Sequence, residues 1–362
     1  VEPPGEGDPI RGWRIVESGT SHWYRSIGRN KKSVTLDLKS ERGRELVKEL
    51  LKTADVVVEN FRPGVIEKWG LGPDDLKPFN PGLIYARISG YGQTGPYSSK
   101  PGYASVTEGV SGFRYVNGFP GEPPVRPNLS IGDTVSGIHA ALGVCLALLQ
   151  RNRSPGGEGQ VVDVALYESM FNLMEGVVPE FSGAGVIREA SGTTVTGIVP
   201  TNTYRSSDGK FLVIGGNGDS IFKRLMTAAG HPEMAENPAM ANNEGRVEHE
   251  AEIDAALNAW CAANTAQHIL DTLEAERVPV GLIYNVEDQL NDPHFQDRGM
   301  FEEVDIDGKP LQIPAILPKL SQTPGRTDWP GLAVGSHNDE VLKGVLALSD
   351  EEVESLKSEG VV

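Results

Sequence analysis

Short apolar segments alternate with amphipathic segments over the first ninety residues. Residues 33–38 and 55–59 are apolar enough for strands, and residues 41–52 between them place apolar side chains at helical spacing. A helical stretch at 64–69 and an apolar strand at 83–88 repeat this order. Strands that alternate with helices predict a parallel sheet covered by helices, and continuous apolar strands suit burial on both faces.

The later sequence predicts one long helix and a second lobe. A glycine- and proline-rich segment follows residue 90 and leads to an apolar helix predicted at 134–149, with a strand at 160–166 after it. Residues 202–297 combine a hairpin near 204–214 with two or three helices. Paired strands at 301–313 and a terminal helix at 338–348 are expected to complete the chain.

These elements predict an α/β fold with a large Rossmann-like domain and a smaller α+β domain. We predict that the large domain spans residues 1–195, that the small one spans 200–298, and that 299–362 returns to the large domain. A chain of 362 residues exceeds one typical domain of about 100–200 residues. The first residues, Val1 to Gly5, resemble the end of a strand entering a loop, so we expect that an opening strand and helix are missing.

Composition and net charge limit the classes of partner that this chain is expected to bind. The chain has 33 Lys and Arg against 50 Asp and Glu, and this net charge of −17 argues against broad binding to nucleic acid or anionic membranes. We expect that no apolar stretch approaches the roughly 20 residues of a membrane helix, and therefore no membrane partner is expected. Cys145 and Cys261 are far apart, which favours a reducing compartment. We expect the cytoplasm or the mitochondrial matrix.

Asp133 stands before the long apolar helix. The N–H groups at a helix start have no intrahelical acceptor, and together with the helix dipole they favour an ionised carboxylate held in one orientation. A carboxylate nucleophile needs this environment. From the sequence alone, a purely structural N-cap is the favoured interpretation of an aspartate at this position.

Two further segments carry candidate chemistry. The phenol of Tyr103 is suited to donate a hydrogen bond to a developing oxyanion, although packing explains a single tyrosine as well. The turn from Gly215 to Asp219 follows a strand, and its backbone amides are suited to approach a ligand closely. Both segments therefore remain open to a structural interpretation.

Two common kinds of binding site, for dinucleotides and for metal ions, are not expected from the sequence. Gly90, Gly92 and Gly95 have the spacing of a dinucleotide fingerprint, but Pro96 and an irregular segment follow where a helix should begin, so we interpret them as a turn. The seven histidines and two cysteines show no metal-binding spacing, and no catalytic metal is expected. In this acidic chain, cations before and after the early strands are candidates for phosphate contacts: Arg29, Lys31, Lys32, Arg62 and Lys68.

Taken together, the chain resembles the class III CoA-transferases, the formyl-CoA transferase and carnitine CoA-transferase group. The family-like segments are Arg29–Leu38, Val58–Gly64, Ser89–Pro96 and Gly132-Asp133, each weak alone and specific jointly. The resemblance extends over nearly the full length of the chain. With Ala165–Ser169, these segments look most like transferases that use succinyl-CoA and a second dicarboxylic acid.

The resemblance implies roles for particular residues. Asp133 would be the covalent nucleophile, with Tyr103 near it and Gly215 and Gly216 in a mobile glycine loop. Coenzyme A would contact Leu36, Asn60, Phe61, Arg62 and Lys68. Its thioester would be a substrate, and no cofactor would be bound permanently.

The resemblance also implies a mechanism and an assembly. The nucleophile would take the acyl group as a mixed anhydride and then CoA as an aspartyl-CoA thioester, before the acceptor acid reverses the sequence. The partners would be an acyl-CoA, a carboxylic acid and a second copy of the chain in an interlocked homodimer.

Departures from the family pattern leave alternatives. Ala104 stands where formate- and oxalate-specific members carry an acidic residue, which disfavours oxalate. An α-methylacyl-CoA racemase shares the fold, but such racemases carry a histidine where this chain has Tyr103. A non-catalytic CoA-binding relative is the other alternative, because a fold does not guarantee a function.

Overall fold

The computed structural model describes residues 1–362 as two compact units. The first comprises Val1–Thr107, Ile131–Ser169 and Leu290–Val362, and the second Glu108–Ser130 and Met170–Gln289. Residues 108–130 and 170–195 thus join the second unit, whereas the sequence places them in the large domain. The predicted domain limits stay a prediction.

A three-stranded parallel sheet lies at the centre of the first unit. Strands β3 (Val56–Glu59), β4 (Ile84–Ser89) and β5 (Val161–Ala165) are arranged in the order β3-β4-β5. Both neighbouring pairs run parallel. Five of the six residues of β4 are buried, as expected for a central apolar strand. The predicted α/β fold with a parallel sheet is confirmed.

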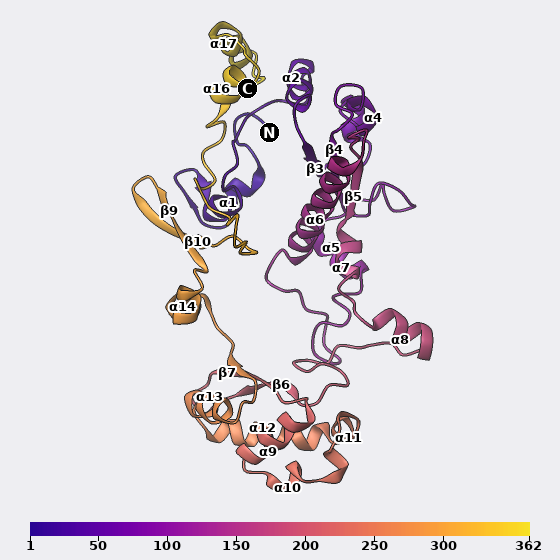
Figure 1. The fold of residues 1–362 in the computed structure, drawn as a ribbon, viewed down its shortest axis with the longest axis vertical. Coiled ribbons are helices and arrows are strands. Elements are labelled where there is room, and N and C mark those ends of the chain that lie inside the picture. The colour runs from indigo at the N-terminus through magenta and orange to yellow at the C-terminus, as the bar shows by residue number, and fades with distance from the viewer. The chain divides into compact units, whose positions relative to one another are not determined.

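Helices connect these strands. α2 (Glu41–Leu51) begins after Ser40, whose hydroxyl accepts a hydrogen bond from the Gly43 amide at 2.9 Å and so caps the helix. α3 (Val65–Lys68) and α4 (Pro73–Leu76) follow β3, and α6 (Ile131–Arg153) runs along β4 and β5 (Figure 1). Because α6 leads back to the start of β5, its own first turn lies at the edge where the parallel strands end.

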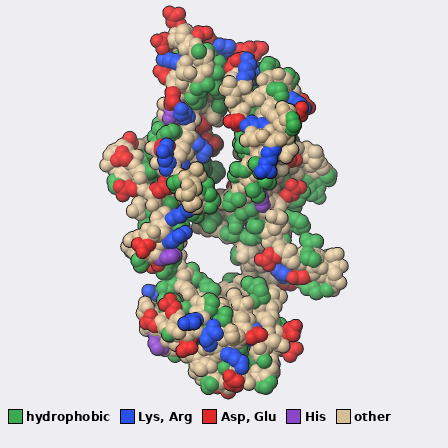
Figure 2. Space-filling view, viewed as in Figure 1, with side chains coloured by type: hydrophobic (Ala, Val, Ile, Leu, Met, Phe, Trp, Pro, Cys, Tyr) green, Lys and Arg blue, Asp and Glu red, His purple; other side chains and the backbone are tan.

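One side of α6 is apolar and exposed within this chain. The exposed side chains follow one another at helical spacing and form what we call the α6 stripe: Ile138, Leu142, Leu146 and Leu149. Figure 2 shows hydrophobic side chains gathered over the first half of α6. By length and composition alone, α6 is also long and apolar enough to cross a membrane. The expectation that no stretch reaches that length is therefore wrong. One such helix is weak evidence that a protein spans a membrane, because the core helix of a soluble protein can meet the same criterion.

An ionic cluster around Glu2 joins the start of the chain to the segment after α1 (His22–Ile27). The Glu2 carboxylate accepts hydrogen bonds from Arg11 Nε at 2.6 Å, the Asp8 amide at 2.9 Å and Ser33 Oγ at 2.7 Å. Burial alone would raise the pKa of Glu2, but these hydrogen bonds lower the pKa to about 2 from its ordinary 4.5. The carboxylate therefore stays ionised in the folded chain at neutral pH.

The remaining elements of the first unit are short. Near the start lie the 3-10 helix η1 (Pro9–Gly12) and the strand pair β1 (Val16–Glu17) and β2 (Thr20–Ser21). The C-terminal part contains α15 (Pro293–Asp297), the hairpin of β9 (Phe301–Ile306) and β10 (Lys309–Pro314), α16 (Asn338–Gly344) and α17 (Asp350–Ser358). Three helices contain a boundary between the two units along the sequence: α5 (Ala104–Val110), α7 (Leu166–Phe171) and α14 (Val286–Asn291).

The second unit packs helices against an antiparallel sheet. Its strands β6 (Thr201–Arg205), β7 (Phe211–Gly215) and β8 (Val280–Leu282) are arranged in the order β6-β7-β8. Its longest helix, α12 (Glu250–Ala263), contacts β6. The other helices are α8 (Val177–Ala184), α9 (Asp219–Ala228), α10 (Pro232–Ala235), η2 (Pro238–Met240), α11 (Asn243–Glu248) and α13 (Ala266–Ala275).

Three predicted elements differ from the structure. Residues 33–38 form no regular strand, because only Thr35 makes a parallel bridge, to Glu2. α6 begins three residues before the predicted start, at Ile131, so Asp133 lies inside its first turn and does not precede it. A second terminal helix, α17, was missed, although Ser349 and Glu352 form a reciprocal capping box at its start.

Replacing Glu2 with glutamine should remove stability in a pH-dependent way. A carboxylate with a depressed folded-state pKa stabilises the fold above its unfolded pKa of 4.5 and loses this contribution as the pH falls towards about 2. Glu2→Gln should therefore be less stable than wild type at pH 7, and the gap should close across that range. Urea denaturation at several pH values measures the gap. Exposed Glu6→Gln is the control, and a pH-independent gap for Glu2→Gln would contradict the assignment.

Candidate active site

A cavity of about 340 Å³ opens where the parallel strands end. Residues from all three strand ends line it, because the carboxyl ends of parallel strands meet at one edge of a sheet. Asn60 to Pro63 follow β3, Ile88 to Gly90 end β4, and Leu166 follows β5. All residues that line the cavity belong to the first unit. The position fits the usual place of ligands in parallel α/β sheets.

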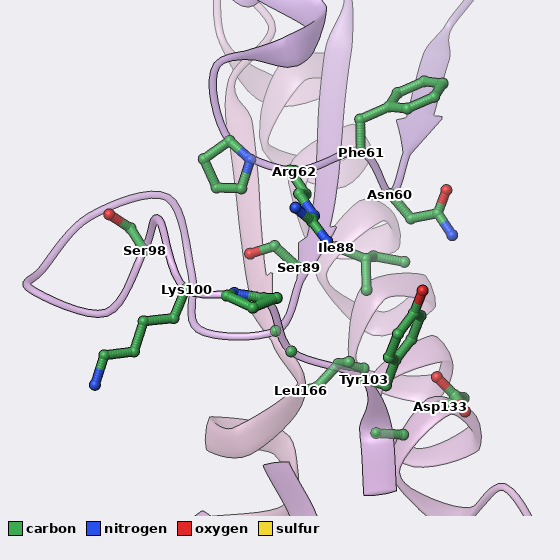
Figure 3. Close-up of a pocket in the computed structure, with 15 residues that line it drawn as sticks. Asn60, Phe61, Arg62, Ile88, Ser89, Ser98, Lys100, Tyr103, Asp133 and Leu166 are labelled. Carbon is green, nitrogen blue, oxygen red and sulfur yellow. The ribbon is translucent and has the colours of Figure 1, made fainter. Parts of the chain in front are cut away.

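The turn after β3 forms one wall of the cavity. Glu59, the last residue of β3, accepts a hydrogen bond from the Phe61 amide at 2.7 Å through its side chain. Phe61 also packs edge-to-face against Trp69, with ring centroids 5.1 Å apart. Asn60 and Arg62 flank this anchored residue, and all three residues line the cavity, although the Phe61 ring points away from Tyr103 and Asp133 (Figure 3).

Asp133 lines the same cavity from the first turn of α6. Within this first turn the Ser136 hydroxyl donates to the Gly132 carbonyl at 2.7 Å. The first four N–H groups of a helix lack acceptors within the helix, and its dipole favours an anion at this end. The position therefore suits an ionised carboxylate that reaches solvent and a ligand.

Tyr103 stands beside Asp133. Its carbonyl accepts from the amides of Val106 and Thr107 at 2.9 and 3.1 Å, which fixes the residue at the start of α5. The side chain is 79% exposed, and Figure 3 shows its hydroxyl pointing from the level of Asp133 towards Asn60. The phenol is therefore accessible to a ligand in the cavity.

A close approach of two glycines places Tyr103 against the end of β4. A Cβ on Gly90 would lie 3.0 Å from the Gly102 Cα, and a Cβ on Gly102 would lie 2.9 Å from the Tyr91 ring. A side chain at Gly90 would press against the Gly102 backbone, and one at Gly102 would have to displace the Tyr91 ring. The loop from Gly90 to Gly102 is thereby closed at both ends on the edge of the sheet.

This loop contributes Lys100 to the cavity lining, with its ammonium group pointing away from Tyr103 and Asp133 (Figure 3). Lys100 Nζ lies 3.4 Å from the centre of the Tyr97 ring, a cation–π contact, and Tyr97 packs against Tyr91. Lys100, Arg62 and Asp133 all line the cavity. Arg62 adds a positive charge to this lining, which suits an anionic ligand.

The cavity brings together five of the nine predicted site residues: Asn60, Phe61, Arg62, Tyr103 and Asp133. Leu36 and Lys68 do not line it. The Leu36 side chain is 1% exposed and packs in a core cluster with Val341 and Leu342, so only its backbone is available to a ligand. Lys68 is exposed on α3.

Gly215 is the last residue of β7 in the second unit, and Gly216 follows it. Their amides already donate within that unit, Gly215 to the Pro279 carbonyl at 3.0 Å and Gly216 to the Pro200 carbonyl at 2.8 Å. A Cβ on Gly216 would lie 2.4 Å from the Leu225 side chain, so packing explains this glycine. In this conformation neither amide is available to an oxyanion, and the catalytic role of these glycines stays a prediction.

Several residues of the cavity were not predicted as site residues from the sequence: Ile88, Ser89, Ser98, Lys100 and Leu166. Ile88, Ser89 and Leu166 lie at or just after the ends of predicted parallel strands, and that position was the signal available for them. The residues of the structure form no group of three metal-ligating side chains. The expectation that the reaction needs no catalytic metal remains a prediction.

Comparison with known proteins identifies the family. The model of CoA-transferase family III matches residues 1–338. A succinyl-CoA–D-citramalate CoA-transferase of Chloroflexus aurantiacus is 44% identical over 364 residues, which cover 100% of this chain and 90% of that protein. Human succinyl-CoA:glutarate CoA-transferase is 31% identical over 365 residues, with 100% and 82% covered.

Solved structures agree with this assignment. A CaiB/BaiF family protein from Brucella suis has a TM-score of 0.83 and 31% sequence identity, covering 95% of this chain and 90% of that chain. The relatives and the family model thus extend over both units. The chain belongs to CoA-transferase family III and is a CoA-transferase, an enzyme that takes CoA thioesters as substrates.

Proposed function

We propose that this enzyme moves CoA from succinyl-CoA to a second dicarboxylic acid through an aspartyl-CoA thioester on Asp133. The observation that carries the proposal is that Asp133 shares one cavity with Tyr103 and the Asn60–Arg62 turn. Relatives named for succinyl-CoA act with citramalate, malate or glutarate, which supports this substrate class.

The reaction begins with attack of the Asp133 carboxylate on the thioester carbonyl of the donor. The C–S bond breaks, CoA leaves as a thiolate, and a mixed anhydride joins the acyl group to Asp133. The thiolate then attacks the Asp133 carbonyl and releases the donor acid, leaving aspartyl-CoA. The acceptor carboxylate attacks this thioester, and the freed thiolate takes the acceptor acyl group from the second anhydride, which regenerates Asp133.

Each step passes through a tetrahedral oxyanion. The amides of the first turn of α6 and the Tyr103 hydroxyl are the donors near Asp133 that suit this charge. We assign no oxyanion contact to the Gly215 and Gly216 amides, because both already donate to carbonyl groups. The proposed donors therefore all belong to the first unit.

The cavity also fits the two anionic parts of the substrates. Asn60, Phe61 and Arg62 form the wall that we assign to CoA, and Arg62 gives this wall a positive charge. Ala104 is 5% exposed and lines the cavity with a methyl group, so it adds no negative charge against a dicarboxylate. This charge balance supports an acid that carries a second carboxylate.

Intact-protein mass spectrometry after mixing with succinyl-CoA tests the nucleophile. Wild type should gain a CoA adduct that hydroxylamine removes and that maps to Asp133. Asp133→Ala should form no adduct and should lose at least about 10³-fold in transfer rate, because the covalent route is removed. Exposed Asp74→Asn, which lies on α4, is the matched control and should behave as wild type.

Other outcomes would point elsewhere. An adduct that persists in Asp133→Ala would reject Asp133 as the nucleophile. Exchange of the α-proton of an acyl-CoA in deuterated water, without transfer, would favour a racemase. CoA binding without either reaction would favour a non-catalytic relative.

We also propose that the enzyme is a homodimer in which a second copy covers the α6 stripe. Ile138, Leu142, Leu146 and Leu149 are each at least 46% exposed in the single chain. Contiguous apolar surface of this kind is unfavourable in water and marks a contact surface. Net charge disfavours an anionic membrane as the alternative cover.

Light scattering coupled to size exclusion tests the assembly. Wild type should have twice the chain mass of 38.9 kDa. Leu146→Glu should shift the population towards monomer, because it places a charge within the covered stripe. Leu320→Glu, an exposed leucine outside α6, is the control and should stay dimeric. A monomeric wild type would reject the proposal.

A further inference from the structure

Arg87 connects three elements beneath the CoA wall of the cavity. It lies on β4 directly opposite Glu59 of β3, and both residues are 6% exposed. Its Nε donates to Glu59 Oε1 at 2.7 Å. One Nη nitrogen forms an ion pair with Glu67 Oε1 of α3 at 2.6 Å. Arg87 does not line the cavity itself.

These contacts hold the wall at both ends. The Glu59 carboxylate that binds Arg87 uses its other oxygen to accept from the Phe61 amide at 2.7 Å, which fixes the start of the turn. Glu67 is on α3, which begins directly after the turn at Gly64. Because Gly64 has a φ of +84°, the chain reverses sharply there, and the Glu67 ion pair fixes the direction of departure.

Stability alone does not explain this arrangement. A buried ion pair is often no more stabilising than apolar residues of similar volume, because both charges lose their hydration. Here the other Nη nitrogen of Arg87 is buried without a hydrogen-bond partner. Burial lowers the pKa of Arg87, but the hydrogen bonds to Glu67 and Glu59 outweigh it and raise the pKa, so the charge is retained. What the network provides is a fixed geometry for residues 60–67.

We infer that Arg87 is a positioning residue that sets the affinity of the enzyme for CoA by holding the Asn60–Pro63 wall between Glu59 and Glu67. The inference rests on the proposed function in assigning this wall to CoA. The planar guanidinium matters because its separate nitrogens contact two carboxylates in fixed directions, which a single ammonium group does not reproduce. Asp133 lies on α6 and has no part in this network, so the chemical step should be affected little.

Glu67→Gln is the gentlest test, because the Glu67 side chain is 42% exposed and the Glu59 contact stays intact. It should raise KM for succinyl-CoA and the Kd for CoA by about two- to fivefold, with kcat unchanged. Arg87→Lys should raise both by about tenfold or more. In the Glu67→Gln/Arg87→Lys double variant, the increases in KM and Kd should not multiply, because both substitutions disrupt the same Arg87–Glu67 ion pair.

Asp55→Asn is the matched control. Asp55 pairs with Arg151 at 2.7 Å at the opposite edge of the sheet, and it too is an exposed acid paired with a less exposed arginine. Its KM and Kd should equal those of wild type. A thermal unfolding midpoint for each variant identifies any loss of fold.

Binding of CoA, followed by calorimetry in the Asp133→Ala background, separates this inference from the proposed reaction. Weaker CoA binding in folded Glu67→Gln and Arg87→Lys supports the positioning role, even if wild type fails to form the aspartyl adduct. Unchanged Kd in both folded variants would overturn it, even if the adduct forms. A fall in kcat with KM unchanged would also overturn it.

Discussion

The parallel pairing of β3, β4 and β5 is the constraint on which the site depends. It brings the residues after three strands, Asn60, Gly90 and Leu166, to one edge although they are far apart in sequence. The same topology turns the first helical turn of α6 towards that edge, and with it Asp133. A register shift of one residue would turn Arg87 away from Glu59, so the pairing also fixes the support beneath the cavity.

Local patterns in the sequence predicted much of this arrangement. Apolar runs and helical spacing located α2, β3, β4 and β5, because these elements bury the faces that their patterns describe. Convergence of Asn60, Arg62, Tyr103 and Asp133 followed from the resemblance to a family. The apolar pattern at 33–38 did not give a regular strand, because that segment packs against residues near the C-terminus and pairs only with Glu2.

Residues whose surroundings come from distant segments were harder to predict. Leu36 is buried by Val341 and Leu342, some three hundred residues later, and nothing near it in sequence shows this. Gly215 and Gly216 have the sequence of a ligand-binding turn, yet carbonyl groups of Pro279 and Pro200 occupy their amides. Gly90 was correctly interpreted as part of a turn, and its packing against Gly102 supplies a physical reason for the glycine.

The unpartnered nitrogen of Arg87 has a consequence for engineering. A buried donor without an acceptor destabilises a fold by about 1–3 kcal/mol, so this position is one at which apolar replacements can raise thermal tolerance if Glu59 and Glu67 change with it. Selection for heat resistance alone would therefore favour changes at the support of the cavity wall. Variants obtained in that way need to be screened at low substrate concentration, where weaker capture of the substrate becomes visible.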